Sequence, residues 1–172
     1  AAALVPEDVP VHVEFVGPAE GAAGDAVREV IRREGLESRI TLAGGMPKER
    51  LLQRLAGGQV YAMPTYHATE GHSNALTEAM ALGLPVISCD QGFTGDVLGN
   101  DAGILVAPRA PQAIAEAIIR LARDADLRRR MGKEARRRAK ELYSDLVVIR
   151  KWGRIYEDLV AGRDPAAREA AL

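Results

Sequence analysis

The sequence predicts an α/β protein with a Rossmann-like, doubly wound parallel sheet that ends in three helices. Short, almost wholly apolar runs alternate with helical patterns between residues 11 and 106, an order typical of strand–helix–strand units. After Val106 the patterns are helical only. The length of 172 residues, with 47% apolar and 27% charged residues, is that of one globular domain.

Five short strands are expected, and each is bounded by Gly, Pro or polar residues. They are residues 11–16, 39–43, 59–63, 85–88 and 103–106. The runs are nearly all apolar, whereas a strand with one face in water alternates apolar and polar residues. We therefore expect parallel strands that are covered on both faces.

Helices are expected between the strands, at residues 25–34, 47–55 and 74–82. The first follows a candidate cap at Asp25, the second carries Pro47 in its first turn, and the third ends at Gly83. Right-handed crossovers between parallel strands place a ligand beyond the carboxyl ends of the strands.

Three further helices follow Val106, and each has an apolar stripe expected to face the core. The stripes are Ile114, Ile118 and Leu121; Leu127, Met131, Ala135 and Leu142; and Val148, Trp152, Ile155 and Leu159. Residues 1–162 are thus expected to form one domain, with 163–172 a frayed tail. Residues 1–5 are interpreted as the last turn of a helix stopped by Pro6, which indicates a domain truncated at its N-terminal side.

Composition excludes several classes of protein. Twenty-three basic and 24 acidic residues give a net charge of −1, so no global field favours nucleic acid or an anionic membrane. Cys89 is the single cysteine, which rules out an internal disulfide and a structural zinc site. No apolar run has the length of a membrane span, and we expect a soluble, cytoplasmic protein. A basic stretch leaves peripheral contact with the inner membrane face as an alternative; it comprises Arg128, Arg129, Arg130, Lys133, Arg136, Arg137, Arg138 and Lys140.

The segment 63–88 contains the main candidate ligand-binding residues. Its pattern predicts a strand, a loop, a helix, a turn and a strand. Small and hydrogen-bonding residues gather where the helix begins, at Gly71, Ser73 and Asn74. The first turn of a helix has unpaired N–H groups and a partial positive charge, which together favour an anion such as a diphosphate.

Two carboxylates frame this helix start. Glu70 precedes it, and Glu78 lies four residues after Asn74 on the same helix face. Carboxylates repel phosphate but accept hydrogen bonds from paired hydroxyls. The pattern suits a ligand with a diol at each end and a diphosphate between, which is the shape of a nucleotide sugar.

The pattern of Glu70, seven residues, Glu78 and the run 79–86 resembles the signature of the C-terminal, donor-binding domain of family 4 retaining glycosyltransferases with the two-domain GT-B fold. The resemblance extends to residues 16–18, 40–44, 103–106 and 112–121, and so covers nearly the whole chain.

The resemblance implies transfer of a hexose from a UDP- or GDP-sugar to a glycan, lipid or small-molecule acceptor, with retention and without a cofactor or tightly held metal. Glu70 would contact the transferred sugar as the catalytic candidate, and Glu78 would bind the ribose. The other implied donor-binding residues are Gly71, His72, Ser73, Asn74 and Thr77, with Gly45, Met46, Pro47 and Lys48 near the base and Gly92, Phe93 and Thr94 in another loop.

The chain departs from the family pattern in having no equivalent of the Arg and Lys that follow the family's first C-domain strand. The acceptor-binding domain is also absent from residues 1–172, so we expect the isolated chain to recognise the donor without catalysing transfer. Two alternatives stay open: a GT-B protein like the non-hydrolysing sugar-nucleotide epimerases, and a non-catalytic nucleotide-sugar-binding or oligomerisation module. Apolar surface left by truncation would favour a homo-oligomer or a domain swap.

Each histidine and the cysteine also has a structural interpretation. His72 either touches the donor or packs beside the helix cap, and His67 is expected in an exposed loop. His12, in a strand, is expected to be structural. Cys89 is expected to be a small buried apolar residue. The basic stretch is interrupted by acids and lacks aromatic residues for base stacking, so no nucleic-acid partner is expected.

Overall fold

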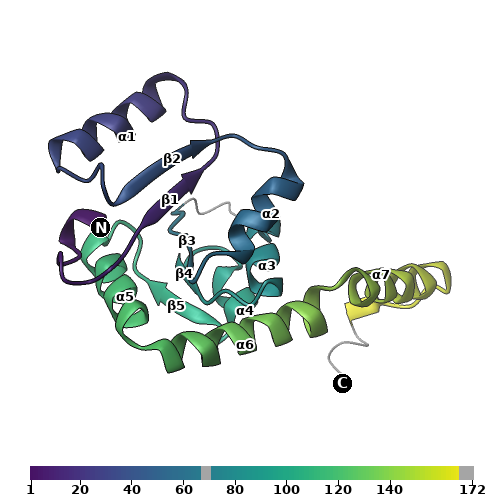
Figure 1. Cartoon of the computed structure of the whole chain (residues 1–172). Helices are drawn as coiled ribbons and strands as arrows, with labels where there is room; N and C mark the ends of the chain where they lie inside the picture. Colours follow the sequence, from purple (N-terminus) through teal and green to yellow (C-terminus); the bar gives the residue numbers. More distant parts are fainter. Residues whose placement is uncertain (67–70, 167–172) are drawn as a thin grey trace.

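The computed structural model describes residues 1–66 and 71–166, and Figure 1 shows their arrangement. The elements follow in the order η1 (Ala2–Leu4), β1 (Val13–Val16), α1 (Gly21–Arg33), β2 (Ile40–Gly44), α2 (Lys48–Ala56), β3 (Tyr61–Met63), α3 (Asn74–Ala81), β4 (Val86–Cys89), α4 (Thr94–Leu98), β5 (Gly103–Val106), α5 (Pro111–Arg123), α6 (Ala125–Tyr143) and α7 (Asp145–Val160). All five predicted strands and the three closing helices are therefore confirmed.

Every strand pairing is parallel, as predicted. β1 pairs with β2, and β4 lies between β3 and β5 in a second ladder. Within the described ranges no ladder joins the two groups of strands. The carboxyl ends of β3, β4 and β5 therefore meet at one edge, where ligands bind in open α/β sheets.

The core is built on both faces of β4, whose four residues are all buried. Val86 packs with Leu76 and Met80 of α3 in a cluster that also takes in residues of α4 and α6. Ile87 and Cys89 point to the other face, in a cluster with residues of α5 and α6. Successive strand residues face opposite sides, so this pattern confirms for β4 that both faces are covered.

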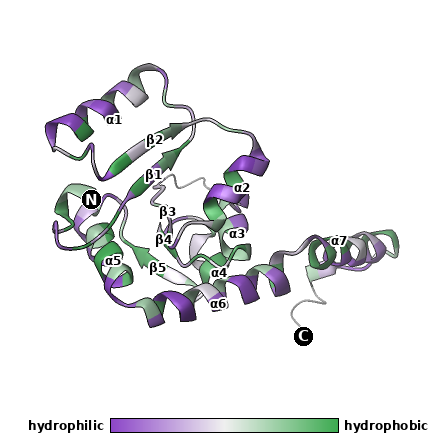
Figure 2. Ribbon diagram, viewed as in Figure 1, coloured by the Kyte–Doolittle hydropathy of each residue, from purple (hydrophilic) through white to green (hydrophobic). Residues whose placement is uncertain are grey.

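The prediction of two covered faces is wrong for β1, where the Phe15 side chain is 50% exposed. Two clusters of buried residues form around β3, β4 and β5, and a third joins the N-terminal segment to α5, while α1 covers the β1–β2 pair from above in Figure 1. Figure 2 shows apolar residues on β1 and β2, although none of the clusters found among residues 1–66 and 71–166 contains a residue of these two strands.

The predicted start of the first helix at Asp25 is also wrong, because α1 begins at Gly21 with Glu20 as its cap residue. Ala22 and Ala23 have high helix propensity and extend the helix toward its N-terminus. The Asp25 carboxylate instead accepts a hydrogen bond from Arg28 at 2.9 Å. In α2, Pro47 is the cap residue, one position before the helix.

The closing helices differ from prediction in which side chains they bury. Leu142 is exposed, whereas Ala139 is buried in the cluster around α3. Residues Leu127, Met131, Ala135, Ala139 and Tyr143 are spaced by four, so a strict four-residue stripe continues through Ala139 and leaves Leu142 outside it.

The stripe predicted to face the core on α7 largely faces solvent instead. Val148, Trp152 and Leu159 are exposed, and Ile155 is half-buried. Figure 1 shows the reason: α7 extends away from the body of the molecule beyond the end of α6. Residues 1–5 include a 3-10 turn at η1 rather than an α-helical turn. The part of the predicted frayed tail at 167–172 lies outside the described residues.

Candidate functional site

The candidate site lies at the carboxyl edge of β3, β4 and β5. The Ser88 hydroxyl of β4 donates a hydrogen bond to the Met63 carbonyl of β3 at 2.7 Å, and the Asp90 amide donates to the Val106 carbonyl of β5 at 3.1 Å. The first bond adds a side-chain link at the last paired position of β3 and β4, and the second lies one residue past the last paired position of β4 and β5. The loops that follow the three strands are thereby fixed side by side.

The N-terminus of α3 opens onto this edge. Ser73 caps the helix, because its hydroxyl accepts a hydrogen bond from the Leu76 amide at 3.4 Å. The same hydroxyl lies 3.4 Å from Met63 Sδ, at the end of β3. Gly71, His72 and Asn74 are exposed around the cap. The predicted anion-binding turn is therefore accessible and tied to the end of β3.

Thr77 lies one turn further along α3, and its hydroxyl is engaged within the helix. It donates to the Asn74 carbonyl at 3.0 Å. Such a bond to the preceding turn turns the hydroxyl back onto the helix backbone.

An ion pair joins α2 to α3 beside the cap. Lys48 Nζ lies 2.6 Å from Glu78 Oε1, although the two residues are 30 positions apart. The hydrogen bond and the charge of Glu78 raise the pKa of Lys48 above its usual value. Burial and, second, the charge of Glu78 raise the pKa of Tyr61 in β3. Glu78 is thus a half-buried acceptor set between Lys48 and Tyr61.

The β2–α2 loop runs directly into this ion pair. Gly45 and Pro47 are exposed and Met46 is half-buried, immediately before Lys48. The structure therefore brings Lys48, which follows Gly45, Met46 and Pro47 in the chain, into contact with Glu78 from a distant segment.

The loop after β4 contains the other predicted group. Gly92 is exposed in the left-handed region at φ +55°, and Phe93 is 60% exposed. Thr94 is the first residue of α4 and is buried, and its amide donates to the Gln91 carbonyl at 3.1 Å. Gly92 and Phe93 thus face solvent at the carboxyl edge, whereas the Thr94 side chain faces the interior.

The histidines and the cysteine singled out in the sequence differ in their contacts and burial. The His72 ring packs against Tyr143 of α6 with centroids 4.8 Å apart, and His12 makes a 2.9 Å hydrogen bond with the Thr41 hydroxyl across β1 and β2. Cys89 is buried, which raises the pKa of its thiol and confirms the structural interpretation. Glu70 and His67 lie outside the described residues.

Two residues at this edge were not predicted from the sequence. Tyr66 follows β3, Arg109 follows β5, and the Arg109 Cζ lies 4.9 Å from the centroid of the Tyr66 ring. The run Ala107-Pro108-Arg109-Ala110-Pro111 marks a tight connection, but its side-chain contact depends on the order of the strands in the sheet. No local pattern signals that contact.

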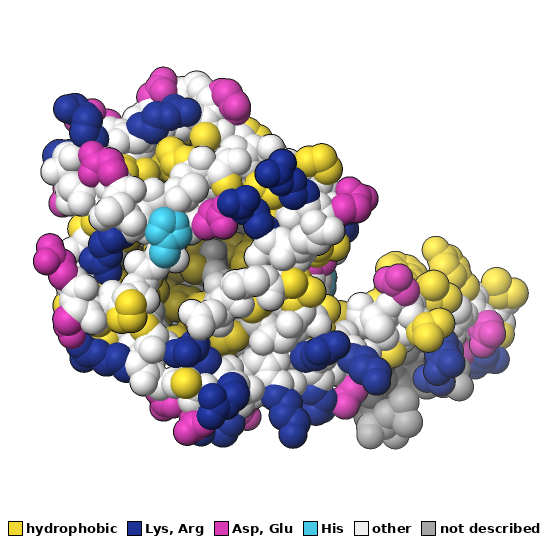
Figure 3. Space-filling model, in the orientation of Figure 1, with side chains coloured by type: hydrophobic (Ala, Val, Ile, Leu, Met, Phe, Trp, Pro, Cys, Tyr) yellow, Lys and Arg dark blue, Asp and Glu magenta, His cyan; other side chains and the backbone are white. Residues whose placement is uncertain are grey.

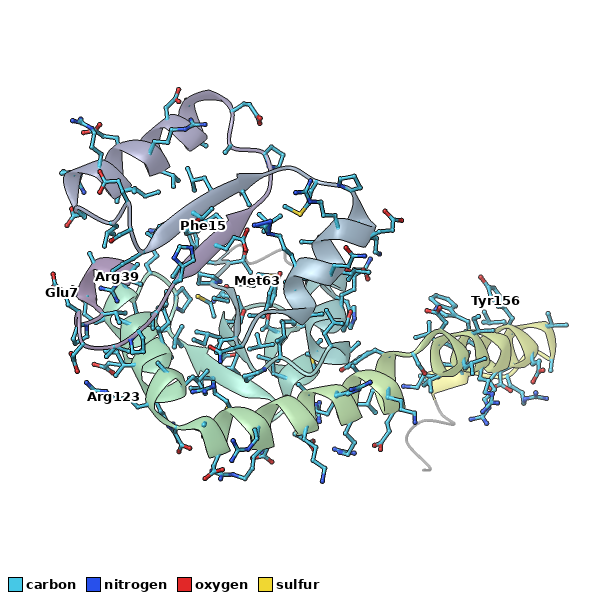
Figure 4. The ribbon with its side chains drawn as sticks, viewed as in Figure 1. Glu7, Phe15, Arg39, Met63, Arg123 and Tyr156 are labelled. Carbon is cyan, nitrogen blue, oxygen red and sulfur yellow. The ribbon has the colours of Figure 1, made fainter. Side chains whose placement is uncertain are left out.

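Figure 3 shows the hollow of the molecule below the β1–β2 layer, with hydrophobic side chains in its wall. In Figure 4, Phe15 of β1 is labelled above Met63 of β3, which lies near the middle of the view. A separate depression of about 680 Å³ lies between the N-terminal segment and the end of α1, and contains none of the predicted donor-binding residues.

Part of the basic stretch of α6 forms bonds within the chain. Arg128 donates to the Ala122 carbonyl, Arg137 pairs with Glu134 and Glu141, and Arg138 donates to the carbonyls of Asp96 and Val97. The hydrogen bond from Arg137 lowers the pKa of Glu134. Arg137 is thus paired with acids of its own helix, whereas Arg128 and Arg138 are bound to backbone carbonyls.

Neither a metal cluster nor a membrane-spanning helix is found in the described part of the chain. Residues 1–66 and 71–166 contain no group of three or more His, Cys, Asp or Glu side chains placed to hold a metal ion. No helix among them is both long and apolar enough to cross a bilayer.

Comparison with known proteins yields a family match and several relatives. The family model described as "Glycosyl transferases group 1" matches residues 1–138. The MMP alpha-(1->4)-mannosyltransferase of Mycolicibacterium hassiacum is 30% identical over 135 residues, which are 77% of this chain and 32% of that protein.

Two solved structures show the same fold over nearly the whole chain. The sucrose-phosphate synthase of Thermosynechococcus elongatus gives a TM-score of 0.81 at 27% identity, covering 94% of this chain and 41% of that one. The Anabaena protein HepE in complex with UDP gives 0.78 at 27% identity, with 93% and 43% covered. The chain thus spans less than half the length of each of these three proteins.

Proposed function

The chain belongs to the group 1 glycosyl transferases, and on that premise we propose that residues 1–172 form the donor-binding domain of a family 4 retaining hexosyltransferase. The substrate is a UDP- or GDP-sugar. One observation carries this proposal: Glu78, which forms the ion pair with Lys48, lies on the same helix, α3, whose Ser73-capped N-terminus follows β3.

The chemistry of each group fits one part of a nucleotide sugar. The amides of the first turn of α3 suit the diphosphate, because they are unpaired donors at the positive end of a helix. Glu78 is an acceptor suited to the two ribose hydroxyls, and the adjacent Gly45–Met46 loop provides a surface for the base. Glu70, by the resemblance, would contact the transferred sugar.

The known relatives support a nucleotide-sugar donor. HepE has been solved with UDP and, at 26% identity to this chain, with UDP-glucose. The relative from Mycolicibacterium hassiacum is a mannosyltransferase by name. The proposal therefore includes both UDP-sugars and GDP-sugars as donors. Residues 1–172 are assigned to recognition of the donor, and recognition of the acceptor is not assigned to them.

Titration calorimetry of the chain with UDP, GDP, UDP-glucose and GDP-mannose tests the proposal. We expect saturable binding of one nucleotide class. Glu78→Ala should weaken it about tenfold or more, because a hydrogen bond to a charged group contributes roughly 1.5–3 kcal/mol. Glu116→Ala is the matched control, since Glu116 is an exposed helical acid on α5.

Glu70→Ala should remove mainly the part of the affinity that depends on the sugar. A comparison of UDP with UDP-glucose, or of GDP with GDP-mannose, isolates that part. Equal losses for the free nucleotide and its sugar conjugate in both the Glu70 and Glu78 variants would reject this division of roles. Absence of any binding would reject the donor-binding function of the chain.

A further inference from the structure

Arg109 is held in an unfavourable backbone conformation at the carboxyl edge of the sheet. Its φ of +58° makes it the one residue other than glycine with positive φ in the described ranges. A side chain with a Cβ is disfavoured there, whereas glycine adopts the conformation freely. A strained residue of this kind persists only where its surroundings fix it, and such residues cluster at functional sites.

The conformation places a guanidinium across the end of the central strand. Arg109 follows β5 and Tyr66 follows β3, with β4 between them in the sheet. The guanidinium lies over the Tyr66 ring, with Cζ 4.9 Å from its centroid, a geometry in which the ring's electron-rich face attracts the cation. The contact therefore bridges the carboxyl end of β4.

This bridge ends next to the helix start of the proposed donor site. Tyr66 lies three residues after Met63, whose sulfur is 3.4 Å from the Ser73 hydroxyl that caps α3. The cation on Arg109 and the exposed first turn of α3 thus belong to the same edge of the sheet.

Other cations near this edge are already engaged. Lys48 is paired with Glu78 at 2.6 Å, and Arg138 donates to the carbonyls of Asp96 and Val97. By contrast, no carboxylate of the described residues forms an ion pair with Arg109. Its five guanidinium donors remain suited to an oxyanion, which arginine binds in bidentate fashion.

We propose that Arg109 is an anion-contacting residue of the donor site, held over Tyr66 so that its guanidinium meets the diphosphate of the nucleotide sugar. The assignment rests on the proposed function. It also gives a reason for an arginine at a position whose φ of +58° would suit glycine better.

Calorimetry with UDP, GDP and the uncharged nucleosides uridine and guanosine tests the assignment. Arg109→Gln should weaken binding of the cognate diphosphate about 5- to 20-fold and leave the nucleoside unchanged, because only the charged hydrogen bonds are lost. Arg109→Lys keeps the charge but loses the bidentate fork and the planar contact with Tyr66, so its affinity should lie between those of the unmodified chain and Arg109→Gln. The dependence of affinity on salt should also become weaker in Arg109→Gln.

Arg109→Gly separates this role from a structural one. Relief of the strained φ should keep or raise the melting temperature, while affinity for the diphosphate falls as in Arg109→Gln. Arg123→Gln is the control, because Arg123 is an exposed arginine whose partner is Asp8 on the N-terminal segment, away from this edge (Figure 4).

The possible outcomes are distinguishable. If the unmodified chain binds UDP or GDP and Arg109→Gln binds it equally well, the assignment of Arg109 is wrong and the proposed function stands. If diphosphate and nucleoside lose the same factor, contact with phosphate is also wrong. If the unmodified chain binds neither nucleotide, the proposed function fails and the Arg109 assignment fails with it.

Discussion

Lys48 Nζ and Glu78 Oε1 lie 2.6 Å apart and join the first turn of α2 to the middle of α3. The pair ties Glu78, which is 27% exposed at its side chain, to the residue that follows the Gly45–Met46–Pro47 loop. A nucleotide ribose bound by Glu78 would therefore meet a carboxylate that is already oriented. Preorganisation of this kind reduces the entropy lost on binding.

Lys48→Met should lower the melting temperature slightly, and by the same amount at pH 7 and pH 9. The pKa of Lys48 is raised above the ordinary lysine value of 10.5 by Glu78, so the pair stabilises the fold fully below that value. The stabilisation is lost as the pH rises through the higher pKa of the folded state. Thermal unfolding at pH 7, 9 and 11 should thus show the difference shrinking only at pH 11, and growth of the difference at high pH would contradict this.

Gly132→Ala should destabilise the fold by about 1–3 kcal/mol, the usual cost of overpacking. A Cβ on Gly132 of α6 would lie 2.2 Å from the Gly83 carbonyl oxygen, which is rigid backbone after α3. Gly153→Ala is the matched control, since a Cβ there meets nothing within 4 Å and alanine should stabilise α7 by about 0.5–1 kcal/mol. Urea unfolding measures the free energy of unfolding of both variants. An equal change in the two would contradict the prediction and show that α6 can move away from the Gly83 carbonyl at little cost.

Ile149→Ala should change the free energy of unfolding by no more than about 0.5 kcal/mol, because its side chain on α7 is 66% exposed. Ile87→Ala removes a fully buried side chain of β4 and should cost about 2–5 kcal/mol. The two variants make the same chemical change in different environments. A large loss at Ile149 would mean that α7 packs against apolar surface in solution.

Cys89 should react slowly with a thiol reagent in the folded chain at pH 8 and rapidly in denaturant. The thiol is 1% exposed, and burial raises its pKa, so both access and the thiolate fraction are reduced. The rate of absorbance change with a chromogenic disulfide measures this. A fast reaction without denaturant would show that β4 opens readily.

The sequence predicted the strands and most of the helices because their signals are local. The apolar run of β4 and the Ser73 cap of α3 are readable from a few neighbouring residues, and both are found in the structure. The start of α1 was misplaced at Asp25 because two plausible starts compete over four residues, and α4 was missed because a five-residue helix has hardly any periodicity.

The sequence by itself thus determined the order of strands and helices, the parallel α/β class and the helix start at Gly71–Asn74, since propensity, capping and hydrophobic period act over a few residues. The tertiary structure alone decided that Lys48 pairs with Glu78, that Thr94 faces inward, that the apolar face of α7 meets solvent, and that Arg109 lies over Tyr66. Each of these depends on which segments pack against each other. Such contacts join residues far apart in the chain, and only the folded arrangement of the sheet and helices brings them together.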